Sequence, residues 1–554
     1  RFKSVCRHQI FFTKRSYLAA FYWRLDAYLF GKSQMKKTSL TGREGQKVNL
    51  GKLLQNSVEQ YGSKTFVTQA ETGECLTYGE FNQLTNHIAH GLIGLGIDDK
   101  EYVAIMLPSC IQFLASSYAL KKIGAIEVAI NNNTRGPSLA RMINLTKSRM
   151  LITTGEYSQQ LSEVSEDLNY LEQVIMTDDH RPAKELFPSL EILPWQSILG
   201  ESSSNFSCEF SDEEIAVILF TSGTTGVSKG CDIPHRSSVR AAESMIEAFN
   251  LTEQDCVYTP YPLYHVGATQ YDILSAMMVG GQAILRQGFS LSNFWSDVCR
   301  YKATWFMSLG SVQQLLWTAE PCIEETQHNL RFIWGTPLPV DHDDFEARFQ
   351  LKLARGTGYG STEAGGVALP LFDKSGAGKV LDRYKVAVVD EDDNELPVGE
   401  SGELVIRPLE PAIMASKYIG MPEETAKAWR NSWFHTGDFA RLDEEGDLFW
   451  LARMSERIRV KGEMVSAYEI EEGIFTHPVV TDCAVIGIPD GTGEEQVKAF
   501  VTLKENKTLA LEELRLFCAP IMSHFMVPTA LEVITKMPRT QTGKPAKAEL
   551  KTRQ

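Results

Sequence analysis

Short apolar, β-branched segments alternate with helical stretches in two runs along the chain. In the run over 64–154 the strand-like segments are TFVTQ, YVAIMLP, IEVAINN and RMLITTG. In the run over 215–354 they are AVILF, VYTPY, QAILR, TWFMSL, RFIWG and LKLARG. Alternation of strands and helices is typical of parallel sheets that are covered by helices on both faces. The pattern therefore predicts two parallel-type α/β subdomains.

The hydrophobic pattern changes after about residue 376. The stretch KVAVVDEDDNELPVGESGELVIRP has short apolar segments between turn residues, which predicts a small antiparallel or β-barrel-like subdomain. From about residue 457 strand-like and helical segments alternate again, over a length that suits a separate domain. We therefore predict an α/β protein whose large N-terminal domain, 35–454, holds all three subdomains. A small, mobile α+β C-terminal domain should follow over 455–554.

The first 34 residues differ from the rest because they are basic, rich in aromatic residues and contain a single acid, Asp26. Their apolar side chains fall at helical spacing, at Leu18, Phe21, Tyr22, Leu25 and Leu29. A basic amphipathic helix is typical of a leader or of a membrane-surface anchor. Two further interpretations stay open: a non-native extension ahead of Met35, and an integral part of the fold.

The composition indicates an acidic protein, since the 554 residues carry a formal net charge of −15. Such a surface repels nucleic acid, so any polyanion site must be built locally from a few cations and backbone N–H groups. The ten cysteines are scattered without a CxxC pair, which favours a reducing compartment over a disulfide framework or a zinc site. The best candidate for a membrane span, near 111–130, is interrupted by Lys121 and Lys122. We expect a cytoplasmic protein, and the leader-like N-terminus leaves an organelle or a membrane surface open.

The stretch LFTSGTTGVSKG, 219–230, is rich in glycine and hydroxyl side chains. It follows a predicted buried strand and precedes PHRSSVRAAESMIEAFN, which has helical spacing. Free backbone N–H groups, hydroxyl donors, a lysine and the start of a helix together suit a polyphosphate. The lysine does not follow the second glycine directly, so the order is not that of the Walker loop. On composition alone, a mobile turn is an equally good interpretation.

Further motifs change this balance. The glycine-hydroxyl loop resembles the phosphate loop of the adenylate-forming superfamily, which includes acyl-CoA synthetases, adenylation domains of peptide synthetases and luciferases. Other segments resemble that family's motifs in the family's order: GYGSTE (358–363), GELVIRP (402–408), WFHTGD (433–438), ARMSERIRVKGEMVSAYEIE (452–471) and PRTQTGK (538–544). The resemblance covers about 49–550. Such a series in order makes coincidence negligible.

The resemblance implies a set of nucleotide-binding residues. The β- and γ-phosphates of ATP would be held by Thr221, Ser222, Gly223, Thr224, Thr225 and Lys229. The adenine would lie between Tyr359, preceded by Gly358, and the segment Gly335, Thr336 and Pro337. Asp438 and Arg453 would bind the ribose, Glu363 would coordinate Mg²⁺, and Thr362 would contact the α-phosphate.

The resemblance also implies residues for the reaction itself. Lys544 would bridge the substrate carboxylate and the α-phosphate, where negative charge builds up in the transition state. A hinge at Ser455 and Glu456 would let the C-terminal domain change pose, and Gly462 would line a pantetheine tunnel. His265 in PLYHVGA resembles an aromatic gate that moves between the poses, while a satisfied core histidine is the plainer alternative.

These implications lead to an ATP-dependent carboxylate–CoA ligase that forms acyl-CoA, AMP and pyrophosphate through an acyl-adenylate. The expected partners are a small carboxylic acid, ATP, Mg²⁺ and CoA, with a homodimer as a further expectation and no nucleic acid. Candidate acyl-pocket residues are Tyr264, Phe306, Ser308, Trp334 and Gly365. Two alternatives remain: an enzyme that loads a carrier protein, and a catalytically silent nucleotide-binding homologue.

The chain departs from the family pattern at a few positions. Ser228 stands where proline is usual, and the hinge has Ser455-Glu456 instead of lysine-aspartate. A non-standard hinge and the overall size resemble the crotonobetaine/carnitine–CoA ligase branch. That resemblance suggests a short or medium, carnitine-like acid as the substrate.

Overall fold

The computed structural model describes residues 48–179, 181–221, 228–335, 342–354, 357–371, 377–454, 457–460, 463–489, 495–539 and 545–552. The first 34 residues and the expected hinge at Ser455 and Glu456 lie outside these ranges.

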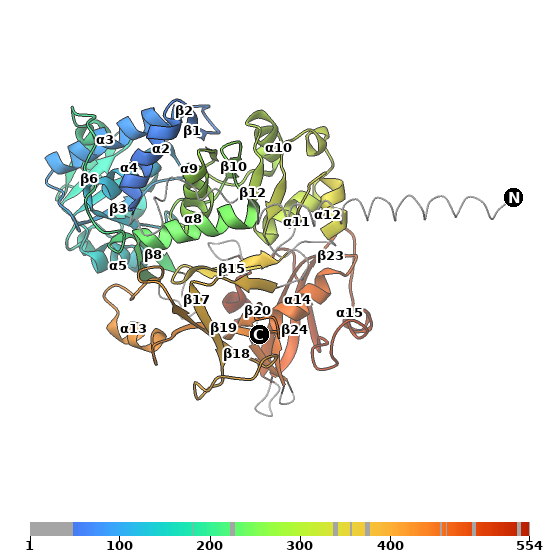
Figure 1. Ribbon diagram of the computed structural model, residues 1–554. Coiled ribbons are helices and arrows are strands. Elements are labelled where there is room, and N and C mark those ends of the chain that lie inside the picture. The colour runs from blue at the N-terminus through green and yellow to red at the C-terminus, as the bar shows by residue number, and fades with distance from the viewer. Residues whose placement is uncertain are drawn as a thin grey trace. The chain divides into compact units, whose positions relative to one another are not determined.

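Two sheets of mostly parallel strands make up the first part of the fold (Figure 1). In spatial order the first sheet contains β7 (Glu191–Pro194), β6 (Gln173–Met176), β5 (Met150–Thr153), β3 (Tyr102–Met106), β4 (Ile126–Ala129), β8 (Ile215–Thr221) and β9 (Lys229–Pro234). The second contains β13 (Phe332–Trp334), β12 (Trp305–Met307), β10 (Cys256–Thr259), β11 (Gln282–Leu285), β1 (Thr65–Gln69) and β2 (Cys75–Thr77). The prediction of two parallel-type sheets is confirmed.

The two sheets exchange strands, which the order of segments along the chain does not reveal. β8 belongs to the second run of the sequence but pairs with β4 of the first sheet, with Glu127 opposite Val217. β1 belongs to the first run but pairs with β11 of the second sheet, with Val67 opposite Ala283. The expected last strand, LKLARG, is reduced to a single bridge between Phe332 and Leu353.

Helices cover these sheets, and their ends carry the expected signals. The longer ones are α2 (Leu50–Tyr61), α3 (Tyr78–Gly94), α4 (Ile111–Ile123), α5 (Gly136–Thr146), α8 (His235–Phe249), α10 (Leu291–Arg300), α11 (Gly310–Thr318) and α12 (His342–Arg348). Thr77 and Glu80 form a capping box at the start of α3. Gly124, at φ +74°, ends α4 in the left-handed conformation that favours glycine. A π-helical segment, Gly267–Leu274, precedes α9 (Ser275–Val279) and packs on α8.

A third sheet is entirely antiparallel. In spatial order it contains β14 (Thr357–Ser361), β15 (Gly365–Leu371), β16 (Ala377–Val380), β20 (Asp447–Arg453), β19 (Phe434–Leu442), β18 (Ser401–Pro408) and β17 (Tyr384–Val389). α13 (Pro422–Ala428) lies in the connection between β18 and β19. The predicted antiparallel subdomain is confirmed, and it begins at Thr357 rather than after residue 376. Figure 1 shows α8 running beside β15, and the two elements are in contact.

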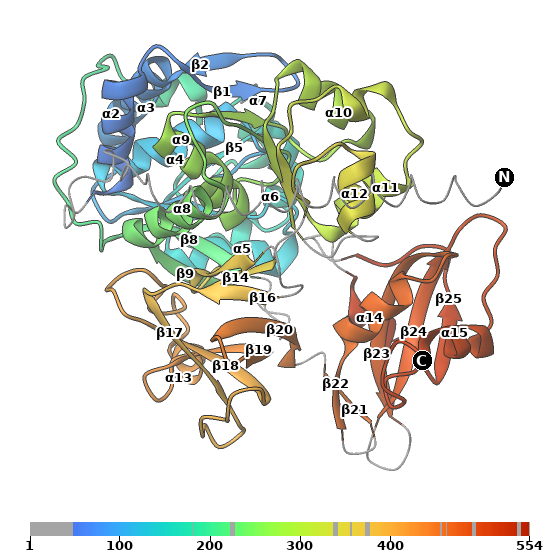
Figure 2. The same cartoon turned by 45° about the vertical axis from the view of Figure 1, so that its right-hand side comes forward.

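The last part of the chain has its own sheet and its own apolar core. β23 (Val480–Pro489), β24 (Glu495–Leu503) and β25 (Ala530–Val533) form the sheet, and β21 (Arg457–Val460) pairs with β22 (Glu463–Ser466) (Figure 2). The helices of this part are α14 (Ala467–Phe475), α15 (Leu511–Cys518) and α16 (Lys547–Lys551). Ile470, Val485 and Leu514 lie in one buried cluster. The predicted α+β character is confirmed, whereas the domain boundary between 454 and 455 stays a prediction.

None of the helices among the described residues is long and apolar enough to cross a bilayer. All cysteines in the described ranges are free thiols.

Candidate active site

The glycine-hydroxyl loop connects two antiparallel strands. Thr221 at the end of β8 pairs with Lys229 at the start of β9. The expected direct turn from strand to helix is therefore wrong, because Lys229–Pro234 pairs with β8 and α8 begins only at His235. The loop residues Ser222, Gly223, Thr224 and Thr225 lie outside the described residues. The two ends of the loop are nevertheless held side by side by the strand pairing.

Lys229 makes two contacts with the segment that precedes β19. Its Nζ atom lies 2.6 Å from Oε2 of Glu424, which belongs to α13. The same Nζ atom lies 4.9 Å from the centre of the Tyr418 ring. The hydrogen bond from Lys229 holds the pKa of Glu424 below its usual value. The one cation of the loop is thus already held by an acid and an aromatic face.

Glu363 lies in the turn between β14 and β15 and meets the same tyrosine. The Tyr418 hydroxyl donates to Oε1 of Glu363 at 2.9 Å. The backbone of this turn is tied down as well, because the Ala415 N–H donates to the Glu363 carbonyl at 2.7 Å. Burial, reinforced by the Glu363 carboxylate, raises the pKa of Tyr418. Tyr418 therefore contacts both Lys229 and Glu363, which sequence analysis assigned to separate motifs.

The donors around Glu363 fit a magnesium ion. Mg²⁺ binds through oxygen atoms, commonly one or two carboxylates together with substrate phosphates. Glu363 offers a carboxylate and Thr362 a hydroxyl, and neither side chain is fully buried. The Tyr418 hydroxyl donates to Oε1 and is itself neutral, so it adds no opposing charge beside the carboxylate.

Asp438 on β19 lies at the centre of a second group of expected residues. The Tyr359 hydroxyl donates to its Oδ2 atom at 2.6 Å. The Trp450 indole N–H donates to Oδ1 at 2.9 Å, and Arg453 lies 3.1 Å from the same oxygen. Asp438 is 2% exposed. Burial, reinforced by the Asp438 carboxylate, raises the pKa of the Tyr359 hydroxyl. A carboxylate has about four acceptor positions, so these donors fix its plane.

The backbone around Asp438 bulges out of the β18–β19 ladder. Glu403 pairs with Phe439 and Val405 pairs with His435, so Leu404 alone faces the segment 436–438. A bulge of this kind redirects the side chains on it. Gly437 adopts φ +68° within the bulge, a conformation that favours glycine. The bulge therefore sets the direction of the Asp438 side chain.

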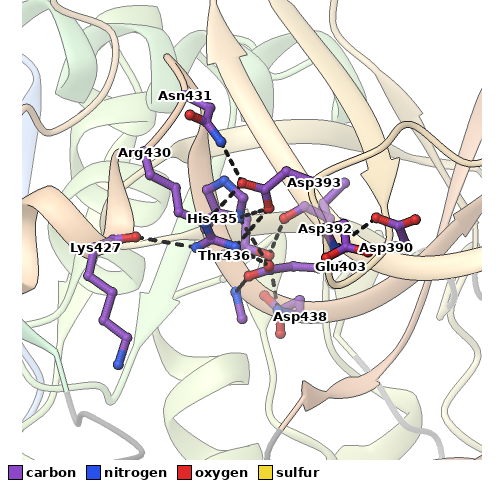
Figure 3. Close-up of polar contacts among 12 residues, drawn as sticks. Asp390, Asp392, Asp393, Glu403, Lys427, Arg430, Asn431, His435, Thr436 and Asp438 are labelled. Carbon is purple, nitrogen blue, oxygen red and sulfur yellow. Dashed lines mark hydrogen bonds and ion pairs between the residues drawn. The ribbon is translucent and has the colours of Figure 1, made fainter.

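Glu403 stabilises this bulge through polar contacts (Figure 3). Its Oε1 atom accepts the Gly437 N–H at 3.1 Å, and its Oε2 atom lies 3.0 Å from Nδ1 of His435. Arg430 lies 3.3 Å from the same Oε2 and 2.9 Å from Asp393. Burial opposes ionisation of Glu403, but these bonds outweigh it and hold the pKa below the usual value. We call Glu403, His435, Arg430 and Asp393 the Glu403 clasp.

Two glycines of the expected adenine site have no room for a side chain. A Cβ atom on Gly335, which has φ +146°, would lie 1.9 Å from the Ser308 carbonyl oxygen. A Cβ atom on Gly358 would lie 2.9 Å from the Ala368 carbonyl oxygen. The expected partners Thr336 and Pro337 lie outside the described residues.

His265 lies in the turn that leads from β10 into the π-helical segment. Its carbonyl accepts the Thr269 hydroxyl at 3.0 Å, and its ring lies 4.9 Å from that of Tyr264. Burial lowers the pKa of His265. Tyr264 in turn lines a cavity of about 420 Å³, with a polar lining that includes Arg135, Asn132, Asn133 and Gln160. The candidate gate therefore lies next to a residue of a polar cavity.

Two of the candidate acyl-pocket residues, Trp334 and Phe306, lie against other aromatic rings. Trp334 lies edge-on to Tyr271 at a ring distance of 6.3 Å, and Phe306 stacks on Tyr261 at 6.0 Å. Two residues of the reaction scheme, Lys544 and Gly462, lie outside the described residues. Arg539 and Pro545, on either side of the Lys544 segment, pair in a β-bridge.

Several residues of this site were missed by sequence analysis. Tyr418 and Glu424 lie in KYIGMPEE, which has no periodicity that marks a site, and Trp450 reads as an ordinary strand residue. Glu403 lies in a recognised motif, but the sequence does not reveal its contact with Gly437.

Sequence comparisons agree with these motifs. The family profile described as AMP-binding enzyme matches residues 54–416, and the profile of the AMP-binding enzyme C-terminal domain matches residues 469–544. The crotonobetaine/carnitine–CoA ligase of Citrobacter koseri is 31% identical over 517 residues, which cover 91% of this chain and 99% of that protein. The protein of the same name from Escherichia coli O9:H4 is 30% identical with the same coverage.

Structural comparisons agree with the fold. The anthranilate CoA ligase AuaEII in complex with anthranoyl-AMP has a TM-score of 0.82 and 23% identity, covering 92% of this chain and 97% of that one. ATP-bound MatB from Rhodopseudomonas palustris has a TM-score of 0.78 and 21% identity, covering 92% and 99%. At these identities the likeness concerns the architecture.

Proposed function

Since this chain belongs to the family of AMP-binding enzymes, we propose that it joins a carboxylic acid to CoA at the expense of ATP. The acid first displaces pyrophosphate from ATP, with its oxygen bonding to the α-phosphorus to give an acyl-AMP. The CoA thiol then attacks the acyl carbon, loses its proton, and releases AMP. The observation that carries this proposal is that residues from distant motifs meet in two groups, one around Tyr418 and one around Asp438.

The first group suits the triphosphate. We propose that Lys229, with Thr221 and the loop residues that follow it, binds the β- and γ-phosphates, and that Thr362 contacts the α-phosphate. Positioning and charge stabilisation are the main contributions that a protein makes to such a transfer. Glu363 would hold Mg²⁺, which when bound neutralises charge on the phosphates.

The second group suits the nucleoside. Asp438, whose carboxylate is fixed by Tyr359, Trp450 and Arg453, would accept hydrogen bonds from the ribose hydroxyls. The Tyr359 ring and Gly335 would form the walls of the adenine site. Gly335 and Gly358 pack so closely against the Ser308 and Ala368 carbonyls that neither has space for a Cβ atom, so the backbone of the proposed adenine site is fixed in place. Lys544 would complete the site from the C-terminal domain.

We also propose that the cavity beside Tyr264 receives part of CoA. CoA is a polyanion, and Arg135 supplies a guanidinium in a cavity whose other lining residues include neutral polar side chains, Glu156 and two prolines. The cavity adjoins the candidate gate, His265, through Tyr264. An Arg135→Ala variant should raise KM for CoA while pyrophosphate release without CoA stays unchanged. Arg141→Ala is the matched control, because it lies in α5, the helix that follows Arg135, but outside the cavity lining.

The acid is proposed to be short or medium in length and carnitine-like. The named activity of the relatives supports this choice, and the aromatic neighbours Tyr271 and Trp334 can accommodate an ammonium group through cation–π contacts. The domain boundary near 454 and a homodimer are proposed on the resemblance alone. Limited proteolysis and sedimentation velocity, respectively, test them.

One assay separates the proposed ligase from its alternatives. The full chain is mixed with ATP, Mg²⁺ and acids from acetate and crotonate to carnitine, aryl acids and long-chain acids, and pyrophosphate and thioester are measured. We expect pyrophosphate and, with CoA, a thioester for at least one acid. Pyrophosphate without thioester would instead favour a carrier-protein-loading enzyme. Nucleotide binding without either product would favour a catalytically silent homologue.

A further inference from the structure

We propose that Tyr418 is a positioning residue that couples Lys229 to Glu363 and keeps these two opposite charges apart. The inference rests on the proposed function, since that function assigns the phosphates to Lys229 and the magnesium ion to Glu363. It adds a residue to which neither the motifs nor the comparisons assign a role.

Tyr418 contacts the two charged groups through different parts of its side chain, the hydroxyl and the ring. Its hydroxyl donates to Oε1 of Glu363 at 2.9 Å, so that this carboxylate is held by a neutral donor. Its ring faces the Lys229 ammonium at 4.9 Å, a distance within the range of cation–π contacts. One side chain therefore contacts the cation and the anion without neutralising either of them.

Tyr418 is itself held firmly. Its backbone forms a bridge with Cys231 of β9, and the next residue, Ile419, donates to the Gly230 carbonyl at 2.8 Å. Its N–H donates to the Thr425 hydroxyl at 3.0 Å, and its ring packs edge-on against Trp429 at 5.2 Å. With 6% of its surface exposed, the side chain has little room to rotate. It can therefore fix the groups that it touches.

The physical consequence concerns charge pairing. Opposite charges that approach in a partly buried site attract strongly, and Lys229 already pairs with Glu424. A further direct pair between Lys229 and Glu363 would occupy the Glu363 carboxylate. A carboxylate in such a pair is less available to a metal ion. The Tyr418 phenol, which contacts both groups, would prevent this pairing at no cost in net charge. Replacement of Tyr418 should therefore damage both functions, in separable ways.

Two variants separate the role of the Tyr418 hydroxyl from the role of its ring. Tyr418→Phe keeps the ring over Lys229 and removes the donor to Glu363, whereas Tyr418→Leu removes both. We expect Tyr418→Phe to need about tenfold more Mg²⁺ for half-maximal pyrophosphate release. Calorimetric binding of ATP in EDTA should be unchanged in Tyr418→Phe and several-fold weaker in Tyr418→Leu. Tyr301→Phe is the matched control, because its hydroxyl donates at 2.9 Å to the Ala70 carbonyl, outside the two groups.

A double substitution tests whether the hydroxyl acts through Glu363. If it does, Tyr418→Phe should have little further effect on the Mg²⁺ requirement of a Glu363→Gln protein. A Tyr418→Phe enzyme with the Mg²⁺ requirement of the wild type would overturn the proposal, as would equal losses of metal-free ATP binding in the Phe and Leu variants. If Tyr418→Leu does not fold, the Phe variant and the double substitution still decide. Failure of the proposed function is distinct, because the wild-type protein would then release no pyrophosphate.

Discussion

The ammonium of Lys229 and the carboxylate of Glu424 form an ion pair at 2.6 Å, between the first residue of β9 and the helix α13. In the proposed function the same ammonium binds the phosphates of ATP. Glu424 therefore occupies the position of an anionic ligand, and ATP must compete with it.

Removing this competitor should strengthen ATP binding. We expect Glu424→Gln to lower KM for ATP about two- to fivefold, since a partly exposed ion pair contributes modestly. Because salt screens such pairs, the difference from the wild type should shrink at high ionic strength. Glu423→Gln, the adjacent position of the same helix, is the matched control. A KM for ATP that rises in Glu424→Gln would contradict the competition.

The Glu403 clasp predicts a selective loss of nucleoside affinity. Glu403→Leu removes the acceptor of the Gly437 N–H and the partner of His435, so the orientation of the Asp438 side chain should no longer be fixed. We expect calorimetric AMP affinity to fall about tenfold, as for lost hydrogen bonds to a charged group. Glu403→Gln keeps one acceptor oxygen and should lie between Leu and wild type.

KM for the carboxylic acid should stay constant across the Glu403 series, since the clasp contacts the bulge that carries Asp438, which the proposed function assigns to the ribose. Glu445→Gln, in the hairpin that joins β19 and β20, serves as a control in the same sheet. Equal loss of AMP affinity in Glu403→Gln and Glu403→Leu, or a parallel rise in KM for the acid, would argue against a positioning role.

The buried Lys122 predicts a pH dependence of stability. Its ammonium donates to side-chain oxygens of Asn82, Thr85 and Asn86, and burial lowers its pKa to about 7. In the unfolded chain a lysine titrates near 10.4. Between these values the unfolded chain binds more protons, so stability should rise with pH from about 7 to about 10.

A Lys122→Met protein lacks this contribution. The free energy of unfolding of the wild type minus that of Lys122→Met should therefore increase by up to about 1.4 kcal/mol per pH unit in that interval. The thermal midpoints of both proteins at pH 7, 8 and 9 measure it, with the exposed Lys52→Met as the matched control. A difference that stays flat with pH would contradict the assignment.

Lys544 carries a kinetic prediction that separates the half-reactions. We expect Lys544→Ala to slow pyrophosphate release about 10²–10³-fold, by analogy with other groups that stabilise developing charge. Thioester formation from a supplied acyl-AMP should be nearly unaffected. Lys536→Ala, an exposed lysine of the same region, is the control. Adenylation at the wild-type rate would refute the role.

Gly335 predicts a steric effect at the adenine site. An alanine there would place Cβ 1.9 Å from the Ser308 carbonyl oxygen at a φ of +146°. We expect Gly335→Ala to weaken AMP binding strongly and to destabilise the fold by roughly 1–3 kcal/mol. Gly94→Ala is the control, because a Cβ atom there meets nothing within 4 Å. Unchanged AMP affinity would argue against a place for Gly335 in the adenine site.

Local features of the fold could be predicted from the sequence, because periodicity is a local signal. The strands TFVTQ and IEVAINN and the helix that starts at His235 were found where the pattern placed them. The pairing of β1 with β11 was not predictable, because an apolar strand carries no mark of its neighbour. The strand β9 was missed since KGCDIP is short and lies between a glycine-rich loop and a helix.

The candidate site shows the same division. The motifs identified Lys229, Glu363, Tyr359 and Asp438 as candidate nucleotide- or metal-binding residues. The structure brings them into two groups. The contacts that hold them come from Tyr418, Trp450 and Glu403, whose importance depends on three-dimensional neighbours. A phenol or an indole in a strand or loop is usually a packing residue, and only the position of its polar atom identifies it as a support.

The strand exchange between the two parallel sheets constrains how the polypeptide can be made. A fragment that ends near residue 200 would leave one edge of β4 bare, since β8 has not yet been synthesised, and would leave β1 without β11. Bare strand edges invite association with other chains. Neither sheet is therefore completed by one run of the sequence alone: the first sheet needs β8 and β9, at 215–234, and the second needs both β1 and the strands as far as β13, at 332–334.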